Sequence, residues 1–201
     1  AAVGDGGAAG DDAAGGDGGA ARDGAAGGDG AAVPTGYFDT ADDAERLVSR
    51  PADPTDNATP SGLTSLAMAL TSYAALAGSV RHREAAAAAL SGVGPLVARH
   101  ARFTGWACAA GEAQLAGPLE IAIAVPEGVD AAPLAYPAWR TGSPGAVVVV
   151  GEPDRPGVPL LADRAAVRGR PTAYVCRDFT CDLPVVEPAD LVRQIGLPDH
   201  P

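Results

Sequence analysis

The chain has 201 residues and a net charge of −11, and its fourteen basic side chains are all Arg. Nucleic acids and anionic membranes are bound by cationic surfaces, so this charge argues against both as partners. No stretch approaches the roughly twenty apolar residues that cross a bilayer, and three Cys residues do not form the disulfide framework of a small secreted domain. We therefore expect a soluble, cytoplasmic protein.

Residues 1–35 are predicted to be a disordered segment. They consist mainly of Gly, Ala and Asp, with Val as their only large apolar residue. Such a composition does not offset the entropy that ordering costs. The chain starts at Ala1 without an apolar signal core, which indicates a break in a longer protein. The glycines contain no GxxxxGK[ST] pattern, so a phosphate-binding loop is not expected.

Residues 36–117 carry helical patterns. The stretch Thr59–Gly78 is predicted to form one helix, with Thr59 as N-cap, Pro60 in the first position and Gly78 as the stop. Large side chains recur along it at helical spacing, and they are expected to form its buried face: Leu63, Leu66, Leu70, Tyr73, and Leu76 or Ala77.

Two further helical patterns follow. One begins near Arg81 and is expected to kink or break at Gly94 and Pro95. A weaker pattern covers Thr104–Ala116. Successive helices joined by a few residues are typical of antiparallel α-hairpins.

Residues 118–201 are predicted to form a small α/β element. Three short apolar runs bounded by Pro and Gly are predicted strands: Leu119–Val125, Ala146–Val150 and Thr172–Cys176. A helix broken at Pro137 is expected between the first two strands, and a last helix is expected at Pro188–Ile195. Because strand, helix and strand in this order form a parallel crossover, the fold class is mainly α with a short parallel sheet and flanking helices.

The polar segment DPTDNATPSG, Asp53–Gly62, precedes the first predicted helix. Asp56, Asn57 and Ser61 bring a carboxylate, an amide and a hydroxyl group to one helix entrance. Hydroxyl-rich ligands such as sugars are held by groups of this kind. Ordinary turn and capping chemistry selects the same residue types, so a helix entrance and a pocket rim both remain open.

A second polar segment, YVCRDFTC, separates Cys176 from Cys181 by four residues. This spacing matches neither zinc knuckles nor the CxxC motif of thioredoxins. Either the two sulfurs approach each other across a turn, or two small side chains pack in a core. His82, His100 and His200 complete no metal site, so neither a metal nor a cofactor is expected.

Three stretches carry a family resemblance: GYFDTADDAERLVSRPADPTDNATPSG, GPLEIAIAV and GRPTAYVCRDFTCDLPV. Together they resemble the carboxy-terminal part of the thioredoxin domain-containing family whose human relative is named spermatogenesis-associated. The resemblance extends from Gly36 to about Ile195. Residues 1–35 have no counterpart in it.

This resemblance implies an amino-terminal thioredoxin-like domain outside this chain, followed by a six-hairpin α/α toroid similar to N-acylglucosamine 2-epimerases and glycosidases. Residues 36–117 would be its last helices, and the earlier hairpins would be missing. The family's FDT and DPTDNATPSG motifs fall on Phe38–Thr40 and Asp53–Gly62. The resemblance thereby implies a cleft rim formed by Asp39, Asp56, Asn57 and Ser61.

The resemblance leaves the reaction open and favours a carbohydrate as ligand, either bound or converted. A first alternative is a non-catalytic interaction or redox-accessory module, in which Cys176 and Cys181 matter more than the acidic residues. A second alternative is an inactive remnant. An incomplete toroid is also expected to leave apolar helix faces exposed.

Overall fold

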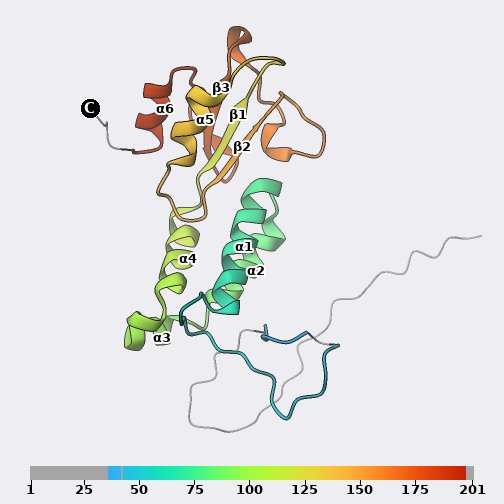
Figure 1. Ribbon diagram of the computed structural model, residues 1–201, viewed down its shortest axis with the longest axis vertical. Coiled ribbons are helices and arrows are strands. Elements are labelled where there is room, and N and C mark those ends of the chain that lie inside the picture. Colours follow the sequence, from blue (N-terminus) through green and yellow to red (C-terminus); the bar gives the residue numbers. More distant parts are fainter. Residues whose placement is uncertain (1–35, 42, 198–201) are drawn as a thin grey trace, which may run out of the picture. The chain divides into compact units, whose positions relative to one another are not determined.

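A computed structural model describes residues 36–41 and 43–197 of the chain (Figure 1). The chain divides into two units, Ala1–Ala31 and Ala32–Pro201, and the described residues all belong to the second unit. The predicted disordered segment 1–35 lies outside the described residues. The last residues of the predicted α/β element, 198–201, do so as well.

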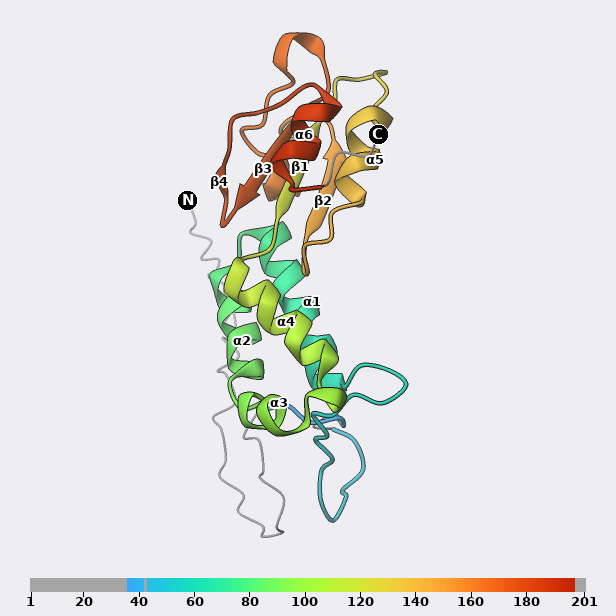
Figure 2. The same cartoon turned by 90° about the vertical axis from the view of Figure 1, so that its left-hand side faces the viewer.

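Four α-helices come first in the described part of the chain: α1 (Gly62–Ala77), α2 (Val80–Leu90), α3 (Gly94–His100) and α4 (Gly105–Ala116). Gly78 ends α1 with a φ of 64°, and its N–H donates to the Ala74 carbonyl. Only Gly78 and Ser79 separate α1 from α2, and the two helices lie side by side in both views (Figures 1 and 2). The predicted stop at Gly78 is confirmed, and the predicted interruption occurs at residues 91–93, so that Gly94 and Pro95 begin α3.

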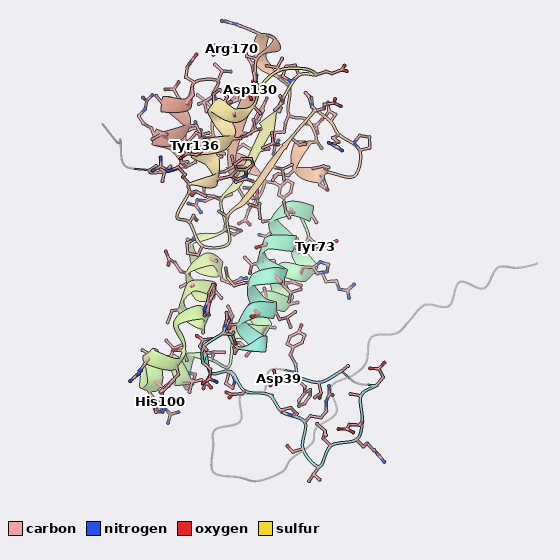
Figure 3. The ribbon with its side chains drawn as sticks, viewed as in Figure 1. Asp39, Tyr73, His100, Asp130, Tyr136 and Arg170 are labelled. Carbon is pink, nitrogen blue, oxygen red and sulfur yellow. A yellow bond between two sulfur atoms is a disulfide. The ribbon has the colours of Figure 1, made fainter. Side chains whose placement is uncertain are left out.

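Small side chains form the buried face of α1, in place of the predicted stripe of Leu and Tyr. Ala67 and Ala74 are buried because α2 and α4 pack against this side of the helix. Tyr73 is 53% exposed and projects from α1 (Figure 3), where its ring meets that of His82 edge-on with the centroids 4.6 Å apart. Only Leu63 of the predicted stripe is fully buried, so the helical spacing was right and the buried side was wrong.

A four-stranded mixed sheet follows, in the order β2-β1-β3-β4. Its strands are β1 (Glu120–Ala124), β2 (Val147–Gly151), β3 (Thr172–Arg177) and β4 (Thr180–Cys181). β1 and β2 are parallel and are joined through α5 (Ala132–Trp139), which confirms the predicted crossover. β3 is antiparallel to β1 and β4, so the predicted parallel sheet is wrong at this end. Parallel neighbouring strands are usually joined by a crossover helix, whereas residues 152–171 form only short 3₁₀ turns.

The remaining elements complete the α/β element. α6 (Pro188–Gln194) agrees with the predicted last helix to one residue, and 3₁₀ turns lie at Pro159–Leu161 and Val167–Gly169. A further 3₁₀ turn, Ala101–Phe103, lies between α3 and α4. The predicted break at Pro137 is wrong, because α5 continues to Trp139. Pro137 removes one internal hydrogen bond from this short helix, and its ring is buried against the core. Within the described residues, no helix has both the length and the apolar character needed to cross a membrane.

Successive side chains of β1 point to opposite faces of the sheet. Ile121 and Ile123 pack into a core with α5 and α6, which cover one face (Figure 2). Ala122 packs on the other face against Leu160 and against Ala75 at the end of α1. Glu120 lies two residues before Ala122 and therefore points to the same face of the sheet. The strand thus places a buried carboxylate on the face that meets the helices.

Candidate functional site

The predicted site segment forms a groove at the start of α1. Tyr37, Phe38, Asp39 and Asp53 line it, together with the first turns of α1, around a volume of about 400 Å³. Asp39 lies on the segment that leads into α1 (Figure 3). Its Oδ2 accepts the N–H of Asp53 at 3.1 Å, whereas its Oδ1 accepts no hydrogen bond from the part of the chain that the structure describes. The groove thus combines two aromatic side chains with an acceptor that a ligand can use.

Gly62 and Arg50 hold this groove in shape. A Cβ atom at position 62 would lie 2.9 Å from Asp39 Oδ1, so glycine lets the carboxylate approach the first turn of α1. The partial positive charge of a helix N-terminus favours a carboxylate there. The Arg50 guanidinium lies 4.1 Å from the centroid of the Phe38 ring and donates through Nε to Thr40 Oγ1 at 3.3 Å. Residues 38–40 are therefore held by contacts with Arg50 and by the close approach of Asp39 to α1.

Asp56 is buried and connects two helices. Its Oδ1 accepts the N–H of Ser61 at 3.0 Å, just before α1, and its Oδ2 accepts the N–H of Trp106 at 2.8 Å, in the first turn of α4. The first N–H groups of a helix have no partner inside the helix, so both oxygens serve as caps. The structure places Asp56 outside the lining of the groove.

Ser61 is the N-cap of α1, where its Oγ accepts the N–H of Thr64 at 3.2 Å. The predicted cap, Thr59, lies two residues earlier, because α1 begins at Gly62 and not at Pro60. Asn57 is exposed, and its side chain makes no hydrogen bond to the described residues. Of the four predicted rim residues, Asp39 alone lines the groove.

Cys176 and Cys181 form a disulfide across the β3–β4 hairpin. They are paired in the ladder one position away from the pair Arg177 and Thr180, which flanks a two-residue turn. Antiparallel ladders alternate between hydrogen-bonded and non-hydrogen-bonded pairs, and the latter bring side chains closest. The four residues between the cysteines are thus the two-residue turn and the single ladder pair, Arg177 and Thr180, that flanks it.

The tip of this hairpin, Asp178 and Phe179, contacts the helices. Both residues have positive φ, 50° and 60°, as in a type I′ turn. The Phe179 ring lies against Gly78, where an added Cβ would come within 3.1 Å of it. Asp178 forms an ion pair with Arg83 of α2. Close to the disulfide, Arg164 Nη2 donates to the Sγ of Cys176 at 3.6 Å.

Glu120 is a further candidate residue that sequence reasoning missed. It is 2% exposed, and its Oε2 accepts the N–H of Phe179 at 2.8 Å. Burial raises the pKa of Glu120; the Phe179 N–H lowers it, Asp178 raises it, and Arg83 and Arg164 lower it by smaller amounts. The feature of the sequence that could have identified Glu120 is its position as an acidic residue inside the otherwise apolar run LEIAIAV.

An apolar groove of about 680 Å³ lies between α2, α3 and α4. Leu90, Val93 and Val97 line it, together with Leu115, which is 92% exposed. Cys108 is exposed at its edge as an unpaired thiol. These helices therefore leave an apolar face uncovered by the described residues.

Within residues 36–41 and 43–197, no group of three or more His, Cys, Asp or Glu side chains is arranged to hold a metal ion. His82 shares a hydrogen bond with Ser79 Oγ at 2.7 Å, His100 is exposed, and His200 lies outside the described residues. No protein-family model, curated protein or solved structure matches the chain. Function is therefore inferred from the groove, the hairpin and the surroundings of Glu120.

Proposed function

We propose that the chain binds a carbohydrate in the groove at the start of α1. The observation that carries this proposal is the meeting of Tyr37 and Phe38 with Asp39 and Asp53 around about 400 Å³. Aromatic rings present an apolar face on which the C–H groups of a sugar ring can pack, and carboxylates accept hydrogen bonds from its hydroxyl groups. The volume lies in the range of small-molecule sites.

Asp39 is the main hydrogen-bond acceptor in this proposal. Its Oδ2 is already held by the Asp53 N–H, so the direction of Oδ1 is set before a ligand arrives. A side chain that is ordered in advance loses less entropy on binding. The glycine at position 62 keeps that oxygen close to the helix.

We also propose that the chain is the carboxy-terminal part of a cytoplasmic thioredoxin domain-containing protein whose α/α toroid resembles sugar epimerases and glycosidases. The α1–α2 pair supports this proposal, since such toroids are built from helical hairpins. The apolar groove between α2, α3 and α4 supports it as well, because a further hairpin would cover that face. The proposal assigns sugar binding to this chain and leaves any conversion to the longer protein.

Isothermal titration calorimetry of the full chain against glucose, mannose, galactose and their N-acetylamino derivatives tests the sugar proposal. We expect at least one sugar to bind, with its affinity lowered about tenfold by Asp39→Asn, which removes the charge of the acceptor. Asp43→Asn is the matched control, because Asp43 is exposed and does not line the groove. Absence of binding to every sugar, or an equal loss in both variants, would contradict the proposal.

A redox-accessory role of the β3–β4 hairpin is a second candidate function. The disulfide between Cys176 and Cys181 favours it, as does Arg164 beside Cys176 Sγ. A cation next to a sulfur stabilises the thiolate and makes the disulfide easier to reduce.

Equilibration in dithiothreitol redox buffers, followed by alkylation and mass measurement, tests the redox role. A reduction potential of about −270 to −200 mV allows exchange with thioredoxin or glutathione systems, whereas a value below about −300 mV indicates a purely structural bond. Arg164→Ala should lower the potential, because the thiolate of Cys176 loses its cation. An unchanged potential in that variant counts against the role of Arg164.

A further inference from the structure

Glu120 opens onto a small polar cavity, separate from the groove at the start of α1. The cavity measures about 150 Å³ and is lined by residues of α1, α2, α4, β1 and the β3–β4 turn. Its polar side chains come from all five elements: Thr71, Arg83, Gln114, Glu120 and Asp178. Since water occupies about 30 Å³ in the liquid, the cavity has room for about five water molecules or a ligand of that size.

The cavity holds hydrogen-bond acceptors to which the protein supplies no donor. Glu120 Oε2 is used by the Phe179 N–H, but Oε1 accepts nothing from the residues that the structure describes. Gln114 donates through Nε2 to Thr71 Oγ1 at 2.7 Å, which leaves its own Oε1 as a second acceptor. The Thr71 hydroxyl donates its hydrogen bond to the Ala67 carbonyl, at 2.8 Å. A ligand that satisfies the free oxygens of Glu120 and Gln114 must therefore bring donors.

The charges of the lining leave Glu120 without an ion pair. Arg83 and Asp178 pair with each other. Arg177, close by, donates to the carbonyls of Ala116 and Gly117. A buried carboxylate without an ion-pair partner is destabilising, and a bound cation would remove that penalty.

We propose that this cavity binds a small primary amine as its ammonium ion, with Glu120 as the counter-ion. An ammonium group has three N–H donors and no acceptor. Glu120 Oε1, Gln114 Oε1 and the Asp178 carboxylate are acceptors around the same cavity. The volume suits a short chain such as ethanolamine.

The geometry also gives the binding a pH dependence. Amine binding requires the ionised form of Glu120, which faces Asp178, Arg83 and Arg164 as its charged neighbours. Because burial raises the pKa of Glu120, affinity should increase as pH rises and the carboxyl ionises. It should decrease again in alkaline solution, where the amine loses its proton.

The test is a titration of the full chain with ethanolamine, followed through the backbone amide resonance of Phe179 in phosphate buffer. We expect a saturable shift whose affinity falls about tenfold or more in Glu120→Gln, which keeps the size of the side chain and removes its charge. Glu112→Gln is the control, since Glu112 is exposed on α4 and lies outside this cavity. It should bind as the wild type does.

Three outcomes would overturn the proposal. An equal shift with ethylene glycol would mean that the cavity accepts solvent of any kind. An equal shift with KCl would mean that it accepts any monovalent cation. Equal affinity in Glu120→Gln would show that Glu120 is not the counter-ion. Should that variant fail to fold, a wild-type affinity that stays constant from pH 4 to pH 8 would show the same.

Discussion

Asp56 accepts the backbone N–H of Trp106 at 2.8 Å, which ties the segment before α1 to the first turn of α4, 50 residues further along the chain. The backbone reinforces this contact, because the Asp56 N–H donates to the Phe103 carbonyl at 2.7 Å. The other carboxylate oxygen caps the start of α1 through the Ser61 N–H. One buried acidic residue thus fixes the starts of two helices, α1 and α4.

Asp56→Ala should lower the free energy of unfolding by about 2–3 kcal/mol, because it leaves two helix N–H groups without acceptors. Urea denaturation followed by circular dichroism measures this loss. The neighbouring Asn57→Ala is the control and should change stability by less than about 0.5 kcal/mol, since its side chain is exposed. Similar losses in both variants would show that Asp56 does not act as a cap.

Gly62→Ala should separate ligand binding from stability. Its φ is not in the left-handed region, so alanine suits the first turn of α1 and should leave stability unchanged or raise it by up to about 1 kcal/mol. The new Cβ would meet Asp39 Oδ1 at 2.9 Å and push that carboxylate out of place. We expect weaker sugar binding by calorimetry together with an unchanged or raised melting temperature. A lower sugar affinity together with a lower melting temperature would instead indicate a distorted start of α1.

Gly78→Ala and Gly111→Ala should change stability in opposite directions. Gly78 has a φ of 64° and lies against the Phe179 ring, so a side chain there is strained and crowded and should cost about 1–2 kcal/mol. Gly111 lies inside α4 with open space around its Cβ position, so alanine should add about 0.5–1 kcal/mol. Thermal unfolding of both variants decides this, and a loss at Gly111 would contradict the described packing.

Local signals in the sequence predicted the element positions well. Gly78 stops α1 because glycine tolerates the left-handed conformation of the cap, and Pro188 opens α6 because its fixed φ suits the first turn of a helix. The buried side of α1 was not predictable in the same way, since it depends on how closely α2 and α4 approach Ala67 and Ala74. The direction of β3 likewise depends on what residues 152–171 fold into.

The candidate sites were less predictable, because they depend on contacts between distant segments. The resemblance pointed to Asp39, and the structure places Asp39 beside Asp53 in a groove. The polar segment correctly indicated a helix entrance, but the partner of Asp56 is Trp106, which no local pattern indicates. Glu120 had a signal in its apolar surroundings, whereas its contact with Phe179 required the fold.

The pH dependence of stability should report directly on Glu120. Below pH 4.5, its ordinary pKa, the carboxyl is protonated in both the folded and the unfolded chain. Because burial raises the pKa of the folded form, the unfolded chain releases this proton first as pH rises. Stability is therefore lost as pH rises from 4.5 through the folded pKa. Glu120→Gln removes the ionisation and should escape this loss.

Urea denaturation of Glu120→Gln and wild type between pH 4 and pH 8 measures the difference, in buffers without amines so that the cavity near Glu120 stays unliganded. The variant should be the more stable protein at pH 7, and its advantage should shrink toward pH 4 as the wild-type carboxyl becomes protonated. Glu112→Gln, at an exposed position on α4, should show the same dependence of the free energy of unfolding on pH as the wild type. An advantage of Glu120→Gln that grows toward low pH would mean that a cationic neighbour such as Arg83 or Arg164, rather than burial, governs Glu120.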